Sequence, residues 1–170
     1  NFSINNLELN FNENSQLNFS GLINLENFLS SKLNIKGFNI PFEVFSQFLQ
    51  NINFLNSSSL PKGNLDNFDI EYSDMIKINS LNYVTENGSE LDLQGNFNYI
   101  DFSDTNFDLN LNSSSSNDIT NFFQLIFPKN SNLLSFDKLS LSSNIENENV
   151  KIKELNLAKD ESLISVLGDL

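Results

Sequence analysis

The chain has 170 residues and a net charge of −13, and all nine of its basic residues are lysines. Because this charge has the wrong sign for neutralising phosphates and no arginine is present to contact bases, we expect no nucleic-acid partner. The chain has neither cysteine nor histidine, which removes disulfides, thiolate nucleophiles, the commonest general base and the commonest metal ligand. We therefore expect no enzymatic activity and no cofactor.

Two strands are predicted at the start of the chain, over residues 2–11 and 16–25. In both, apolar and polar residues alternate, which is the two-residue period of a sheet with one apolar face. In the first strand the alternation changes phase between Ile4 and Leu7. A β-bulge at Asn5-Asn6, which adds one residue, would keep both halves of the strand on the same face and would bend it.

A third strand, over residues 32–38, leads to the first predicted helix. After Pro41, apolar residues recur at helical spacing, and proline suits the first turn of a helix. The apolar positions of this helix are Phe42, Phe45, Phe48, Leu49 and Ile52. After the helix, a fourth strand is predicted over residues 64–73.

The pattern of these elements returns 74 positions later. Residues 1–52 align with residues 75–126 without a gap, with identities such as Leu17/Leu91 and Gly21/Gly95. Four further strands are predicted over residues 75–84, 89–99, 105–112 and 133–144.

The second copy repeats the local features of the first. Its first strand changes phase at Asn79 with Ser80, where we predict another bulge. "TENGSE" supplies an Asn-Gly turn that joins its first two strands into a hairpin. A helix is predicted after Asn117 and Asp118, with apolar positions Ile119, Phe122, Phe123 and Ile126.

A third copy begins near Val150, with strands over residues 149–158 and 162–169 and a bulge at Lys153 with Glu154. Self-similarity at a long fixed period is typical of an array. We divide the chain into repeat 1 (1–74), repeat 2 (75–148) and the start of repeat 3 (149–170), all in one continuous domain. Because the chain starts with asparagine and stops within a strand, we expect it to be an excerpt of a longer protein.

The predicted fold is mainly β with short helices: a long curved antiparallel sheet that forms an open trough, with about four strands and one amphipathic helix per repeat. Ten strands about 4.8 Å apart make a sheet roughly 48 Å wide, whereas a helix of ten residues is only about 15 Å long. Two such helices cannot cover the whole apolar face of this sheet. The rest of the face must be buried by curvature of the sheet itself or by a bound ligand.

Two short patterns suggest chemistry only weakly. Ser59-Leu-Pro-Lys62 matches the Ser-x-x-Lys pattern of penicillin-binding enzymes, but no Ser-Asp-Asn or Lys-Thr-Gly follows it. Asp101, Asp104 and Asp108 resemble a calcium loop, but their spacing is wrong for an EF-hand and repeat 1 lacks them. We therefore predict neither a catalytic nor a metal site.

The recurring pattern "IKINSLNYVTENGSELDLQGNF" (residues 76–97), with its bulged strand, turn, second strand and closing glycine, resembles the repeats of the AsmA-like family of Gram-negative bacteria. The resemblance extends over essentially the whole chain. It implies a bridge-like lipid transfer protein: a β-taco in the periplasm that carries phospholipids between the inner and outer membranes. It also implies an inner-membrane anchor and membrane contacts in regions outside this sequence, and it identifies no protein partner.

We expect the apolar face to line a groove for phospholipid acyl chains. Any one of these side chains could instead be ordinary core beneath the helices. The whole array could also be structural, as in a surface fibre or adhesin stalk with a filled interior. The predicted groove residues are Leu7, Leu9, Leu17, Phe19, Leu81, Tyr83, Leu91, Leu93, Phe97, Phe107, Leu109, Leu139, Leu141, Ile152 and Leu155.

Overall fold

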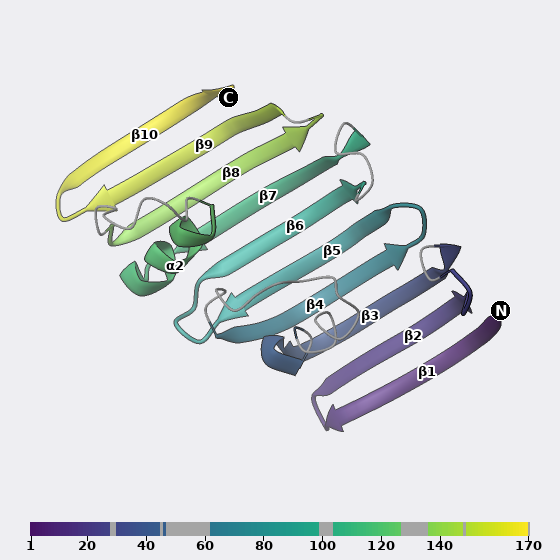
Figure 1. The fold of residues 1–170 in the computed structure, drawn as a ribbon. Coiled ribbons are helices and arrows are strands. Elements are labelled where there is room, and N and C mark those ends of the chain that lie inside the picture. The colour runs from purple at the N-terminus through teal and green to yellow at the C-terminus, as the bar shows by residue number, and fades with distance from the viewer. Residues whose placement is uncertain are drawn as a thin grey trace.

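The structure is a computed structural model that describes residues 1–27, 30–44, 46, 62–98, 104–126, 136–147 and 149–169. Within these residues, ten antiparallel strands form one open sheet in which every strand lies beside its neighbours in the sequence (Figure 1). The strands are β1 (Phe2–Asn12), β2 (Ser15–Ile23), β3 (Lys32–Pro41), β4 (Gly63–Tyr72), β5 (Ile76–Thr85), β6 (Glu90–Phe97), β7 (Asn106–Ser113), β8 (Lys138–Glu146), β9 (Asn149–Lys159) and β10 (Ser162–Asp169).

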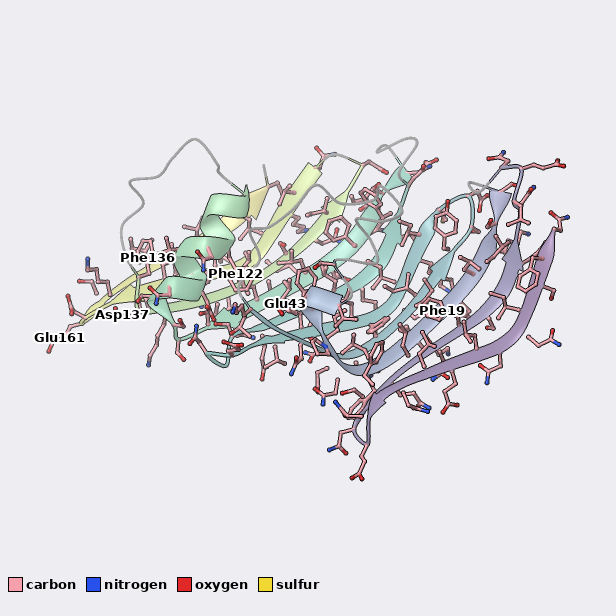
Figure 2. All side chains as sticks on the ribbon, turned by 60° about the horizontal axis from the view of Figure 1, so that its bottom comes forward. Phe19, Glu43, Phe122, Phe136, Asp137 and Glu161 are labelled. Atoms are coloured by element: carbon pink, nitrogen blue, oxygen red, sulfur yellow. The ribbon has the colours of Figure 1, made fainter. Side chains whose placement is uncertain are left out.

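The predicted mainly-β fold is confirmed: the sheet does not close, and it is bent into a trough (Figure 2). Helix α2 (Ser116–Ile126) lies on its concave side, and residues 42–44 are also helical. The element order, four strands with a helix between the third and fourth, occurs twice before β9 and β10 begin it again.

Only the beginning of the helix predicted in the first repeat lies within the described residues. Strand β3 runs to Pro41, three residues beyond the predicted end, because Ile40 and Pro41 still pair with Leu65 and Asn64 of β4. The helical residues begin directly after Pro41. The other predicted apolar positions of this helix, Phe45, Phe48, Leu49 and Ile52, lie outside the described residues.

All three predicted bulges are confirmed by the strand register. Ile4 pairs with Gly21 and Leu7 with Phe19, so Asn5 and Asn6 face the single residue Ser20. Strand β5 shows the same irregularity against β6, and β9 shows it against β10. In β5 the two residues that face a single partner are Asn79 and Ser80, and in β9 they are Lys153 and Glu154.

The glycine at the end of the repeat pattern lies on the strand beside the bulged strand, at a position that only glycine fits. Gly21 and Gly95 pair with the residue just before the bulge, and they have φ values of 137° and 143°. A Cβ atom on Gly95 would lie 2.3 Å from the carbonyl oxygen of Asn106. L-residues rarely adopt this backbone conformation, and here the neighbouring strand leaves no room for a side chain.

The bulges keep one row of apolar positions continuous across the sheet, because directly opposed residues of antiparallel strands share a face. Leu9 pairs with Leu17, and the row continues strand by strand to Leu109. Gly37 makes room in this row, since a Cβ atom there would lie 2.3 Å from the ring of Phe68. The members of the row are Leu9, Leu17, Gly37, Phe68, Leu81, Leu93 and Leu109.

The core lies on the concave side of the sheet. Ile119 and Phe122 of α2 are buried there, in one cluster with side chains from β2 to β9 (Figure 2). The ring of Phe42 packs edge-on against Tyr83, with the ring centroids 5.3 Å apart. The described buried members of this cluster are Leu17, Ile35, Ile40, Leu65, Phe68, Tyr83, Leu111, Ile119, Phe122, Phe136, Leu139 and Leu157.

Candidate ligand-binding face

The strand register places all fifteen predicted groove residues on one face of the sheet, which we call the apolar face. Leu7 pairs with Phe19 and Leu9 with Leu17 at one end of the sheet. The same face continues through β5, β6 and β7 to Leu141 and Leu155 at the other end. The periodicity of the sequence is sufficient to assign this face, because a strand with one bulge keeps its alternation on either side.

The fifteen residues differ in how far they are covered. Leu7 and Leu9 on β1 are 44% and 40% exposed. Leu17, Tyr83 and Leu139 are buried in the core cluster. The remaining ten are partly exposed: Phe19, Leu81, Leu91, Leu93, Phe97, Phe107, Leu109, Leu141, Ile152 and Leu155. The apolar face is thus open at both ends of the sheet, at β1 and at β10, where Ile164 and Val166 are also exposed, and it is most covered around Tyr83 and Leu139.

Helix α2 is fixed over the apolar face by a buried carboxylate. Asp118, in the first turn of the helix, is 1% exposed. It accepts hydrogen bonds from Thr85 Oγ1 at 2.5 Å, Ser89 Oγ at 2.7 Å and Asn87 Nδ2 at 2.9 Å. A negative charge at a helix N-terminus is also favoured by the helix dipole. We call Asp118, Thr85, Asn87 and Ser89 the α2 latch.

Sequence reasoning did not find the α2 latch. It placed Asp118 at the start of the helix, but the cap is Ser115, whose Oγ accepts a hydrogen bond from the Asp118 amide at 3.3 Å. The pattern Ser-x-x-Asp before an apolar run is the available signal for this cap. The partners of Asp118 lie 29 to 33 residues earlier in the chain, so no local pattern connects them to it.

Tyr83 of β5 is buried in the core cluster and stays neutral. Burial, followed by the negative charges of Asp118 and Glu86, raises the pKa of Tyr83 to about 12. Its ring packs against Phe42, and its position opposite Leu65 and Leu91 places it in the middle of the apolar face. The side chain therefore contributes an uncharged aromatic ring to the core at physiological pH.

The opposite face of the sheet is mainly polar, although Leu22 and Phe38 are exposed on it, and it carries ion pairs between strands. Lys153 Nζ lies 2.6 Å from Asp108 Oδ1, and this hydrogen bond holds the pKa of Asp108 below its usual value. Lys36 Nζ lies 2.8 Å from Asp69 Oδ2. These pairs are partly or fully exposed, so each adds little to stability.

Neither of the two weak sequence patterns gains support from the described residues. Among the described residues, no group of three or more acidic side chains could hold a metal ion. Asp104 and Asp108 of the weak calcium pattern are described, and Asp108 contacts Lys153; Asp101 lies outside the described residues. Ser59 also lies outside them, so the Ser-x-x-Lys pattern has no observed geometry.

In the part of the chain that the structure describes, none of the helices has the length and apolar character needed to cross a membrane. No protein-family model, curated protein or solved structure matches the chain. The resemblance to AsmA-like proteins therefore stays a prediction.

Proposed function

We propose that this chain is a lipid-binding and transport module whose apolar face conducts phospholipid acyl chains between the inner and outer membranes. The observation that carries the proposal is the row of apolar positions that runs from Leu9 to Leu109 across seven strands, with its face open at β1. The resemblance of residues 76–97 to AsmA-like repeats also supports it.

The apolar face is chemically suited to acyl chains. Each methylene group exposed to water costs about 0.8 kcal/mol, so a tail of about sixteen carbons costs roughly 13 kcal/mol when it is fully exposed. Partly exposed leucine, isoleucine and phenylalanine side chains on successive strands, about 4.8 Å apart, offset this cost wherever an acyl chain lies against them. Because the repeats present similar residues at each step, the path has no deep trap.

The head groups of such lipids would stay in water at the open side of the trough. This arrangement requires no specific head-group pocket and tolerates the net charge of −13. Because the acidic surface of this chain is repelled by anionic membranes, any attraction to such membranes must come from other regions of the protein. The resemblance to AsmA-like repeats adds to the proposal a periplasmic location, an inner-membrane anchor and membrane contacts outside this sequence.

Photocrosslinking tests this proposal directly. Leu93 and Leu109 pair with each other on the apolar face, whereas Gln94 and Asn110 are their neighbours on the polar face. A photoreactive residue at either leucine position should capture phospholipid in cells, and one at either polar position should not. Equal capture on both faces, or capture on neither face, would contradict the proposal.

A structural array is the alternative function, and the core cluster favours it. Leu17, Tyr83 and Leu139 are buried, which is what a filled interior requires. Under this alternative the protein would carry no lipid. The photocrosslinking experiment then gives no phospholipid adduct at either leucine.

A further inference from the structure

The turn between β5 and β6 contains the one Asn-Gly pair in the sequence, Asn87-Gly88. Both residues are exposed, and a Cβ atom on Gly88 would have no neighbouring atom within 4 Å. Asparagine loses its side-chain nitrogen most readily before glycine, because glycine has no side chain to keep its backbone nitrogen away from the asparagine side chain. Deamidation therefore meets the least steric hindrance at this turn.

This reaction needs no partner other than water. The backbone nitrogen of Gly88 attacks the side-chain carbonyl carbon of Asn87, so that a new C–N bond forms. The bond from that carbon to Nδ2 breaks, and ammonia leaves with the proton of the Gly88 amide. Water then opens the cyclic imide to give aspartate, or isoaspartate, in which the backbone runs through the side-chain carbon. In both products a free carboxylate replaces the amide of Asn87.

Two hydrogen bonds restrain the reacting groups in the folded chain. Asn87 Nδ2 donates to Asp118 Oδ1 at 2.9 Å, and the Gly88 N–H donates to the carbonyl oxygen of Thr85 at 3.0 Å. The first bond fixes the side chain that is attacked, and the second engages the nitrogen that attacks it. The α2 latch and the turn must therefore open before the reaction can occur.

Deamidation in turn breaks the α2 latch. An ionised carboxylate at residue 87 can only accept hydrogen bonds, so Asp118 loses a donor. Two carboxylates at hydrogen-bond distance repel each other, and this repulsion is poorly screened because Asp118 is 1% exposed. The turn also leads into Ser89, whose Oγ donates to Asp118 at 2.7 Å, so the longer backbone of isoaspartate displaces a second donor.

The reactive pair and the buried carboxylate occur together in repeat 2. At the offset of 74 residues, repeat 1 has Glu13-Asn14 in place of Asn87-Gly88, and it has Val44 in place of Asp118. The turn between β9 and β10 contains Asp160-Glu161 and no asparagine. The coupling between the turn and the helix is thus specific to this repeat.

We propose that Asn87 is a self-deamidation site, at which the α2 latch slows the reaction and the product keeps the latch open. The observation that carries the proposal is the hydrogen bond from Asn87 to Asp118, which joins the reactive pair to helix α2. The inference does not depend on what the apolar face binds.

Incubation of the folded chain for several days at mildly alkaline pH, in water enriched in heavy oxygen, tests the site. Each deamidated residue takes one oxygen atom from the water, so mass spectrometry of peptide fragments assigns the reaction to a position. We expect Asn87 to react faster than any other asparagine, including Asn112, which precedes Ser113. Gly88→Asn suits the turn, where φ is 79°, and should leave little product at position 87. Absence of product at Asn87 in the parent chain would overturn the proposal.

Asp118→Ala tests the restraint that the α2 latch places on the reaction. Loss of a hydrogen bond to a charged group should raise the deamidation rate of Asn87 by about tenfold. Gly95→Ala loosens the sheet without removing a hydrogen-bond partner of Asn87, so it should raise the rate much less. Equal rates in Asp118→Ala and the parent chain, or equal acceleration by both variants, would overturn the proposal.

The effect of the product on the helix is measured with the parent chain itself, so it does not depend on the folding of a variant. Ion exchange separates the deamidated form, which carries one more negative charge, from the unreacted form. We expect the α2 amides to exchange hydrogen faster in the deamidated form, whereas the amides of β2 and β3 should exchange at the same rate in both. Equal exchange of the α2 amides in the two forms would overturn the proposal.

Discussion

At the scale of single residues, the repeat pattern is maintained by glycines beside bulged strands. Gly21 and Gly95 occupy the same place opposite the residue that precedes the bulge, and both have φ values that favour glycine. Since the bulges keep the apolar residues on one face, these glycines contribute indirectly to every position of that face.

We predict that Gly95→Ala destabilises the fold by about 1–3 kcal/mol, because alanine at a φ of 143° is strained and its Cβ would contact the Asn106 carbonyl. Urea unfolding followed by circular dichroism measures this change. Gly88→Asn is the matched control: Gly88 has a φ of 79°, which asparagine tolerates in a turn, and no neighbouring atom within 4 Å. Equal free energies of unfolding for Gly95→Ala and the parent chain would refute this role.

At the scale of secondary-structure elements, α2 is the described element that covers the apolar face near β7 and β8. Two kinds of contact hold it there. Ile119 and Phe122 pack into the core cluster, and Asp118 accepts three hydrogen bonds from the end of β5 and the turn that follows it. The α2 latch therefore ties the start of the helix to the end of β5 and the turn between β5 and β6.

We predict that Asp118→Ala lowers the free energy of unfolding by about 2 kcal/mol or more, because it leaves the buried Thr85 and Ser89 hydroxyls without their charged acceptor. Hydrogen exchange of the α2 amides should also become faster than in the parent chain. Asn117→Ala alters the exposed neighbour in the same helical turn and should change neither quantity. If the two variants exchange at the same rate, the latch does not hold the helix.

At the scale of the whole molecule, the architecture could be predicted from the sequence, whereas the attachment of its helix could not. The bulges at Asn5, Asn79 and Lys153 were visible because an apolar alternation that changes phase has one simple structural explanation. The end of β3 at Pro41 was missed, because nothing local shows that Ile40 still pairs with Leu65.

The α2 latch was missed for a related reason, and the sequence left open which apolar residues are core, as the buried Leu17, Tyr83 and Leu139 are. Alternation assigns a residue to a face of a sheet, but it does not show what covers that face. Covering depends on contacts between residues about thirty positions apart, such as Thr85 and Asp118, which no repeat pattern encodes.

The most direct test of the central claim, that the apolar face holds lipid, is the phospholipid content of the purified protein when two adjacent leucines are charged. We predict that Leu93→Asp combined with Leu109→Asp removes bound phospholipid, measured by mass spectrometry of an organic extract, while circular dichroism still shows the sheet. The charge-matched pair Gln94→Asp with Asn110→Asp, on the polar face, should keep its lipid. Loss of the fold in the leucine variant, or unchanged lipid content, would contradict the claim and would assign these leucines to an ordinary core.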